Sequence, residues 1–150
     1  MANAERRGGE CLFLYGSLLP PLAPAGLREA LAGLRPLGRG SLRGALYDLG
    51  EHPGAVPDAE AATWIAGEVF VLPQDPALLA RLDAYEEYTP ERPERSPFVR
   101  ARRRVVLARG GELECWVYAF ARDPRGLPRV ASGDWLGHVR SKTGRCLDQV

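Results

Sequence analysis

Two adjacent glutamates, Glu86 and Glu87, close a segment of helical spacing and are the first residues in this sequence that suggest chemistry. The segment from Ala77 to Tyr88 follows Asp75 and Pro76. An aspartate can accept hydrogen bonds from the free N–H groups that begin a helix, and proline suits the first helical position. The sequence therefore predicts a helix over residues 77–88 that carries both glutamates.

The helix geometry separates these two carboxylates. At about 100° per residue, the apolar side chains gather on one face, which comprises Leu78, Leu79, Leu82 and Tyr85. Glu86 lies roughly 50° from the centre of this face and Glu87 roughly 150° from it, while Asp83 lies near the boundary at about 110°. We therefore expect Glu86 to point inward and Glu87 to point into water.

An inward glutamate has two interpretations. Burying an unpaired carboxylate is costly, so such a group either forms an ion pair or sits in a cavity with a raised pKa. The chain is rich in arginine, which makes a structural ion pair with Glu86 plausible. A carboxyl with a raised pKa would instead suit general acid or base catalysis. The residues alone leave both interpretations open.

The second candidate site is the stretch from Tyr15 to Leu18, which reads Tyr-Gly-Ser-Leu. The apolar run from Cys11 to Tyr15 predicts a buried strand that ends in a turn at Gly16 and Ser17. Glycine lets a ligand approach the backbone, and successive N–H groups can bind a carboxylate or phosphate. A plain turn is the alternative.

Composition limits the other functions. The 150 residues, with 45% hydrophobic and 26% charged side chains, fit one globular domain, and the net charge of +1 favours neither nucleic acid nor an anionic membrane. No apolar run is long enough to span a membrane.

The three cysteines are odd in number and widely spaced, which favours a cytoplasmic protein without disulfides. His52 and His138 lack metal-ligand spacing and no phosphate-binding loop occurs, so we expect neither metal nor cofactor.

The remaining elements follow from periodicity and turn residues. We expect a flexible N-terminal tail over residues 1–10, a domain over 11–140 and a polar C-terminal tail over 141–150. Strands dominate, with two main helices between them. The predictions are a helix at 25–34, strands at 42–49 and 64–72, loops at 55–63 and 89–97, and a hairpin of strands 99–108 and 112–120 around Gly110 and Gly111.

A basic strand face is also predicted. Arg100, Arg102 and Arg104 alternate along the first strand of the hairpin and share one face. This face could bind an acidic partner, but a solvated face that pairs with Glu91 and Glu94 is the simpler interpretation.

Several short motifs occur in an order that resembles the gamma-glutamylcyclotransferase-like family, including its gamma-glutamylamine branch. The resemblance extends from about Leu12 to Trp135. Its motifs are Tyr15-Gly16-Ser17-Leu18, Leu46-Tyr47-Asp48-Leu49-Gly50 with Pro53-Gly54, Gly67-Glu68-Val69-Phe70, Leu82-Asp83-Ala84-Tyr85-Glu86, Phe98-Val99-Arg100, Trp116-Val117-Tyr118 and Ser132-Gly133-Asp134-Trp135.

The resemblance implies an α+β fold, a small mixed β-barrel with helices packed outside it, and a pocket between the first turn and the second helix. It implies that Glu86 is the catalytic acid and base. The N–H groups of Gly16, Ser17 and Leu18 would hold the α-carboxylate of a gamma-glutamyl group, with Tyr15 and Tyr118 lining the pocket.

The implied reaction closes 5-oxoproline from a small gamma-glutamyl amide or amine and releases the amine, without metal or cofactor. The substrate's α-amine, with a pKa near 8, must first lose a proton, which an ordinary glutamate at about 4.3 would accept at a cost of roughly 5 kcal/mol. Burial of Glu86 would remove most of that cost. The alternative is a non-catalytic module that binds a small ligand or a protein on the same fold, and the oligomeric state stays open, with a homodimer as one alternative.

The chain departs from the family pattern in three places. The family often has glycine where this chain has Glu87, and the segment at 89–97 is a charged, proline-rich insertion in the position of a lid. Phe98 stands where relatives carry a tyrosine, so a hydroxyl group is missing there.

Overall fold

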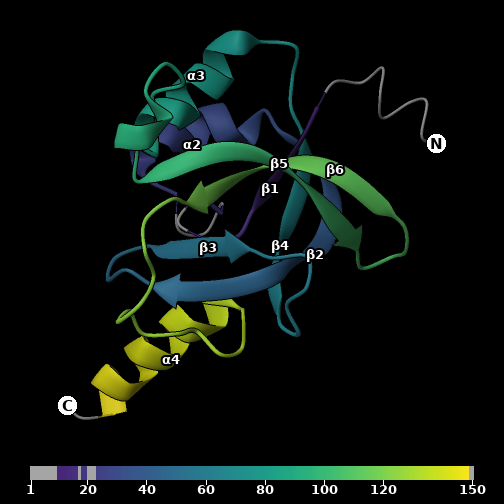
Figure 1. The fold of residues 1–150 in the computed structure, drawn as a ribbon. Coiled ribbons are helices and arrows are strands. Elements are labelled where there is room, and N and C mark those ends of the chain that lie inside the picture. Colours follow the sequence, from purple (N-terminus) through teal and green to yellow (C-terminus); the bar gives the residue numbers. More distant parts are fainter. Residues whose placement is uncertain (1–9, 17, 20–22, 149–150) are drawn as a thin grey trace.

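The structure is a computed structural model that describes residues 10–16, 18–19 and 23–148, with the backbone alone for 143–148. Figure 1 shows the arrangement of its strands and helices. In chain order the elements are β1 (Cys11–Leu14), α2 (Ala25–Ala32), β2 (Arg35–Asp48), β3 (Pro53–Pro57), β4 (Trp64–Val71), α3 (Pro76–Tyr85), the short 3₁₀ helix η1 (Pro93–Arg95), β5 (Phe98–Leu107), β6 (Glu112–Phe120) and α4 (Trp135–Asp148).

Five strands close into a barrel in the order β1-β4-β2-β5-β6, and β6 returns to β1. All neighbours are antiparallel except β6 and β1, which run parallel with Cys115 beside Cys11 and Trp116 beside Leu12. β3 is an additional strand that pairs with β2 and, at Ala55, with β6. The expected α+β fold, a small mixed β-barrel with helices outside, is confirmed.

β1 is apolar along its whole length because both of its faces are buried. Phe13 and Tyr15 point into the barrel interior, where they pack with residues such as Ile65. Leu12 and Leu14 point to the outer face, where they pack under the helices. This two-sided burial places the end of β1, and hence the turn that follows it, at the centre of the molecule.

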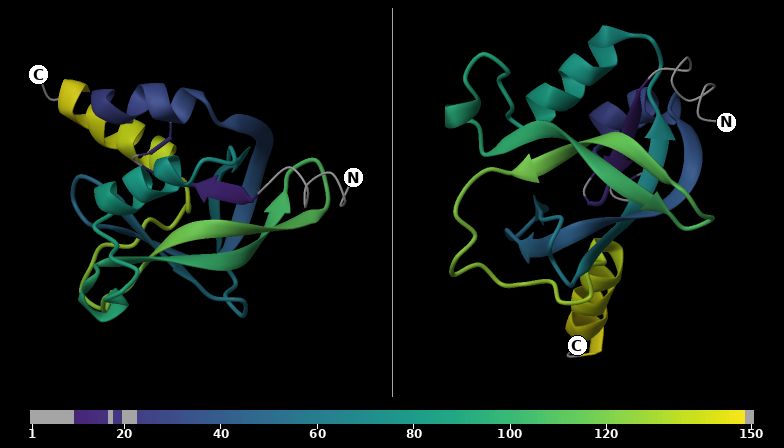
Figure 2. Two further views of the ribbon diagram at one scale, coloured as in Figure 1. Left: turned by 90° about the horizontal axis from the view of Figure 1, so that it is seen from above. Right: turned by 45° about the vertical axis from the view of Figure 1, so that its right-hand side comes forward.

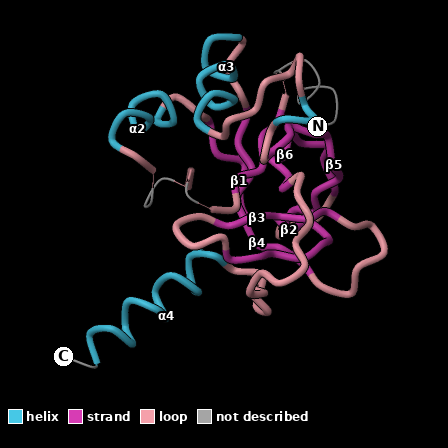
Figure 3. The backbone as a smooth tube through the Cα atoms, turned by 60° about the vertical axis from the view of Figure 1, so that its left-hand side comes forward, coloured by secondary structure: helices cyan, strands magenta, loops and turns pink. Residues whose placement is uncertain are grey.

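The helices lie at two places on the barrel. α2 and α3 lie next to each other over one end (Figure 1), and their buried leucines, Leu27 and Leu31 of α2 and Leu78 and Leu82 of α3, share one outer cluster. α4 lies at the other end and extends away from the barrel (Figures 2 and 3). Since α3 carries Glu86 at its C-terminal end, this packing brings Glu86 over β1.

Three predictions about the elements need correction. β2 begins at Arg35 rather than at Leu42. Residues 53–57 form β3, although the prolines and Gly54 predicted a turn and a loop. Proline is tolerated here because Pro53 and Pro57 stand at the two ends of β3, and the pairing with β6 is made at Ala55. α4 crosses the expected boundary at Ser141, so the segment predicted as a polar tail continues a third helix as far as Asp148.

The loop between α3 and β5 is tied down at its end. It contains η1, and the buried Ser96 hydroxyl accepts a hydrogen bond from the Thr89 N–H at 3.0 Å and donates to the Arg92 carbonyl at 3.2 Å.

The predicted hairpin is confirmed, with Gly110 and Gly111 at positive φ in its turn. Among the described residues, no helix has both the length and the apolar content needed to cross a membrane.

Candidate active site

The C-terminal end of α3 determines where Glu86 points. The helix ends at Tyr85, and the backbone then turns so that the Glu87 N–H donates to the Ala84 carbonyl at 3.1 Å and the Tyr88 N–H to the Asp83 carbonyl at 2.8 Å. This is the Schellman pattern, in which the residue after the cap takes a left-handed conformation. Glu87 takes it, with φ of 58°. The helix therefore stops three residues before the predicted end at Tyr88, and Glu86 occupies its C-cap.

The helical wheel was right about Leu78 and Leu82, which are buried, and wrong about two other residues. Tyr85 is 38% exposed, although the wheel placed it on the apolar face. Asp83 is only 8% exposed, although the wheel placed it at the boundary. Tyr118 and Arg100 hydrogen-bond to Asp83, which allows α3 to turn this carboxylate toward the barrel.

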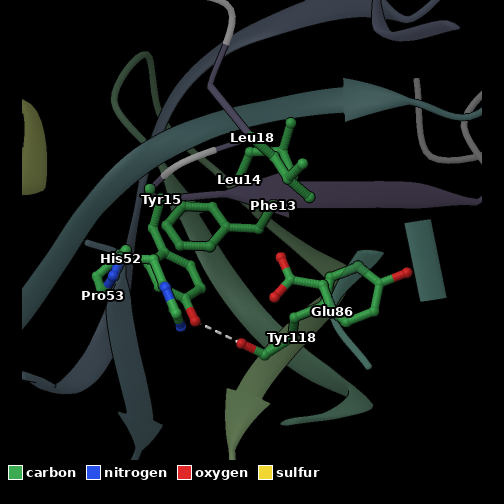
Figure 4. Close-up of a pocket in the computed structure, with 9 residues that line it drawn as sticks. Phe13, Leu14, Tyr15, Leu18, His52, Pro53, Glu86 and Tyr118 are labelled. Carbon is green, nitrogen blue, oxygen red and sulfur yellow. Dashed lines mark hydrogen bonds between the residues drawn. The ribbon is translucent and has the colours of Figure 1, made fainter. Parts of the chain in front are cut away.

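The side chain of Glu86 lines a pocket between α3 and the end of β1. The space between its walls, including its opening to solvent, is about 310 Å³. Figure 4 shows the carboxylate directed into this pocket, toward the side lined by Phe13 and Tyr15. The structure thus brings together Tyr15, Gly16, Leu18, Glu86 and Tyr118, whereas Ser17 lies outside the described residues.

The surroundings of Glu86 favour its protonated form. Burial, and next the negative charge of Glu87, raise the pKa of Glu86 to about 7. Within the described part of the chain, no group hydrogen-bonds to this carboxyl and no basic side chain forms an ion pair with it. The ion-pair interpretation of Glu86 therefore has no support among these residues.

The ion pair belongs to Asp83 instead. Arg100 donates from Nε and Nη2 to the two carboxylate oxygens of Asp83 at 2.9 and 3.2 Å, and the Tyr118 hydroxyl donates to Oδ1 at 2.6 Å. Burial and the bond to Asp83 raise the pKa of Tyr118, so this hydroxyl stays protonated. Asp83 thus fixes the ring of Tyr118 beside Glu86.

Tyr15 is held in the same way. Its hydroxyl donates to the Tyr118 carbonyl at 2.5 Å and accepts from the Ala55 N–H at 3.2 Å, which links β1, β3 and β6. Burial, followed by the charge of Glu86, raises the pKa of Tyr15. Both tyrosines therefore form a neutral, rigid wall.

The turn after β1 needs glycine at position 16. A hydrogen bond from the Leu19 N–H to the Gly16 carbonyl at 2.9 Å closes the turn. A side chain on Gly16 would clash with the ring of Pro53, which begins β3. The close approach of these two segments forms one wall of the pocket.

Sequence reasoning missed part of the pocket lining. His52 and Pro53 also line it, together with Phe13 and Leu14 of β1. The spacing of His52 did not suit a metal ligand and indicated no other role, but His52 directly precedes Pro53-Gly54, which belongs to the motifs that resemble the family. This position next to a family motif was the signal that could have identified His52.

The basic face on β5 does not pair as predicted with Glu91 and Glu94. Arg100 pairs with Asp83, and its guanidinium lies 4.5 Å from the centre of the Trp116 ring. Arg102 pairs with Glu10 and Glu114, and Arg104 with Glu112. These acidic partners come from β6, from α3 and from the residue before β1, so the charges of Arg100, Arg102 and Arg104 are largely neutralised. In the described residues, no cluster of three or more His, Cys, Asp or Glu side chains could hold a metal ion.

A small closed barrel with a half-buried carboxyl opposite a glycine turn defines the class of fold, and comparison with known proteins defines the family. The family model for gamma-glutamyl cyclotransferase, AIG2-like, matches residues 12–137. The chain therefore belongs to the AIG2-like gamma-glutamyl cyclotransferase family.

Individual relatives agree with this assignment. The gamma-glutamylcyclotransferase family protein YtfP of Escherichia coli K12 is 33% identical over 126 residues, which cover 83% of this chain and 95% of that protein. The solution structure of the Escherichia coli protein superposes with a TM-score of 0.58 at 32% identity, covering 86% of this chain and 98% of that one. An AIG2-like protein from Mus musculus shares the fold, with a TM-score of 0.63 at 22% identity over 83% of this chain and 88% of that one.

Proposed function

We propose that the protein is a gamma-glutamylcyclotransferase that converts a small gamma-glutamyl amide or amine into 5-oxoproline and a free amine. Glu86 is its general base and acid. The observation that carries this proposal is the carboxyl of Glu86, with a pKa of about 7, directed into a pocket that the turn at Gly16 closes. The small gamma-glutamyl substrate is the partner, and the cysteine usage favours a cytoplasmic setting.

The reaction needs one proton carrier and no added reactant. The α-amine of the substrate attacks its own gamma-carbonyl carbon, which forms the ring C–N bond. The amine proton passes to Glu86, and the protonated Glu86 then donates it to the departing nitrogen as the amide C–N bond breaks. Atoms balance without water, because the substrate supplies both the nucleophile and the leaving amine. Holding the amine and the carbonyl at attack distance accelerates the closure further.

The raised pKa suits both halves of this proton transfer. An α-amine has a pKa near 8, so a base with a pKa of about 7 lies only about one unit below it, a cost of roughly 1.4 kcal/mol. For an ordinary glutamate the same transfer costs roughly 5 kcal/mol. At neutral pH a large fraction of Glu86 is ionised and ready to act as the base.

The rest of the pocket supports binding of the glutamyl part. The N–H groups of Gly16, Ser17 and Leu18 are proposed to hold the α-carboxylate, as backbone N–H groups in a turn can do. Tyr15 and Tyr118 are fixed by their hydrogen bonds and form the opposite wall. A rigid wall keeps the substrate's amine close to Glu86.

The test is release of 5-oxoproline from a panel of gamma-glutamyl amides, measured for the wild type, Glu86→Gln and the exposed control Glu91→Gln. We expect Glu86→Gln to lower kcat by about 100-fold or more, since it removes the proton carrier, and the control to match the wild type. Turnover that survives in Glu86→Gln would remove this residue from the mechanism. Tight gamma-glutamyl binding by an inactive wild type would identify the protein as a binding module.

A further inference from the structure

A second cavity continues the pocket beyond Glu86. The two share Glu86 and His52 as lining residues, and the second encloses about 660 Å³, including its opening to solvent. Figure 4 shows these two residues on the wall of the first pocket. If the gamma-carbonyl of a substrate lies at Glu86 with its glutamyl part toward Gly16, its leaving amine extends into this outer cavity.

The walls of the outer cavity are mainly apolar and aromatic. Phe98 and Phe120 face each other edge to face, with ring centres 5.6 Å apart, and the His52 ring lies 5.9 Å from that of Phe98. Leu49 and Pro97 complete the apolar lining. Such walls suit an alkyl or aromatic chain, and the aromatic faces also tolerate a cation.

The charges that line the outer cavity are negative. Glu87 contributes an exposed carboxylate in addition to Glu86, and within the described part of the chain the lining contains neither lysine nor arginine. His52 is the basic side chain present. A leaving group with a distal carboxylate would find repulsion there, whereas a distal ammonium would find attraction.

The backbone conformation of Glu87 is a second reason to assign a function to this residue. Glu87 is the non-glycine residue at positive φ among the described residues, in a position where glycine would carry no penalty. Backbone strain of this kind, of order 1 kcal/mol or more, is typical of functional sites. Apart from the backbone bond to Ala84, no hydrogen bond or ion pair of the Glu87 carboxylate occurs within the described residues that would explain its presence.

We propose that the outer cavity is the leaving-group subsite and that Glu87 selects amines with an apolar chain and a distal positive charge, against leaving groups that carry a carboxylate. This proposal rests on the proposed cyclotransferase function and adds the class of the released amine: diamines and related cationic alkylamines rather than amino acids. Phe98 and Phe120 contact the chain of the amine, and Glu87 faces its far end.

The experiment uses three gamma-glutamyl amides of equal chain length, made from an n-alkylamine, an α,ω-diamine and an ω-amino acid. Wild type, Glu87→Gln and Glu87→Gly are compared by the ratio of kcat/KM between the diamine and amino-acid substrates. Taking the ratio within each enzyme cancels the effect of Glu87 on Glu86, which all three substrates share. We expect the wild type to prefer the diamine substrate and both variants to reduce the ratio by about fivefold, the size of a partly solvated charge interaction. High salt should reduce the wild-type ratio in the same way.

The outcomes separate the two proposals. If the wild type releases 5-oxoproline from none of the three amides, the proposed function fails. If it is active but its ratio is close to one, or is unchanged in both variants, the function stands and the assignment of Glu87 fails. Glu87→Gly also guards against a folding artefact, since it relieves the strained backbone and should fold at least as stably as the wild type.

Discussion

Two carboxylates three residues apart, the buried Asp83 and the half-buried Glu86, have opposite surroundings. Asp83 accepts hydrogen bonds from Arg100 and Tyr118, so its role is structural. Glu86 has no such partner among the described residues, and its pKa rises to about 7. The sequence could place both near the core by helical spacing, but the choice of partner depends on which strand faces α3.

The raised pKa of Glu86 makes a prediction about stability. The pKa of Glu86 is about 7 in the folded state, against an ordinary value of 4.5. The group therefore does not change the free energy of unfolding below pH 4.5, and it lowers that free energy by the full amount of the shift above pH 7. That full amount is roughly 3 kcal/mol. Glu86→Gln should therefore raise the free energy of unfolding at pH 8 and change it little at pH 4.5, as measured by urea denaturation at both pH values. A difference that is the same at both would contradict the raised pKa.

The ion pair of Asp83 makes a second prediction. Asp83→Ala leaves the guanidinium of Arg100, whose side chain is 16% exposed, without its carboxylate, and should lower the free energy of unfolding by about 3 kcal/mol. Arg100→Met should cost less in the Asp83→Ala background than in the wild type, because the unpaired charge is then gone. Additive losses in this double-mutant cycle would show that the two side chains act independently.

At the scale of elements, the pocket depends on how closely two short segments approach. The turn after β1 packs on Pro53 at the start of β3, and only glycine at position 16 leaves room for that ring. The motifs indicated that both segments matter, but not that they touch, since β3 itself was predicted to be loop. A strand with proline at both ends is hard to recognise without its neighbours β2 and β6.

Gly16→Ala tests this contact. The added methyl group would overlap the ring of Pro53 and push the turn away from β3, which should cost about 1 to 3 kcal/mol of stability and widen the pocket. Gly26→Ala is the matched control, because a methyl group there meets no atom within 4 Å and lies in the first turn of α2. We compare the melting temperatures of the two variants by thermal unfolding and expect the lower value for Gly16→Ala. Equal melting temperatures would mean that the contact between position 16 and Pro53 is not tight.

At the scale of the whole molecule, the sequence predicted the kinds of element better than their connections. The apolar alternation of β5 and β6 and the glycine pair between them were enough to predict the hairpin. Closure of the barrel was not readable in the same way, because the parallel pairing of β1 and β6 joins residues about a hundred positions apart. That closure puts Tyr15 against the Tyr118 carbonyl, and only the family motifs indicated that these residues share a site.

α4 is attached to the barrel by a polar contact that the sequence did not reveal. Asp48, at the end of β2, accepts hydrogen bonds from the His138 ring at 2.8 Å, from Lys142 at 2.6 Å and from the Gly50 N–H at 2.7 Å. Burial by itself would raise the pKa of Asp48, but these bonds lower it to about 2. The carboxylate is only 8% exposed, so its loss leaves two donors on α4 without their acceptor.

This contact predicts how α4 responds to mutation and to acid. Asp48→Asn should weaken the docking of α4 by about 2 kcal/mol, the size of a hydrogen bond to a charged group, and leave the pocket at the other end of the barrel intact. Because the folded-state pKa of Asp48 is lowered, the stabilisation is present above pH 3.8 and is lost as the pH falls toward 2. Amide hydrogen exchange at neutral pH should show reduced protection over residues 135–142 in Asp48→Asn, with strands β1 and β6 unchanged. Protection lost equally across the barrel would mean that α4 and the barrel unfold as one unit, and protection unchanged in α4 would mean that Asp48 does not anchor it.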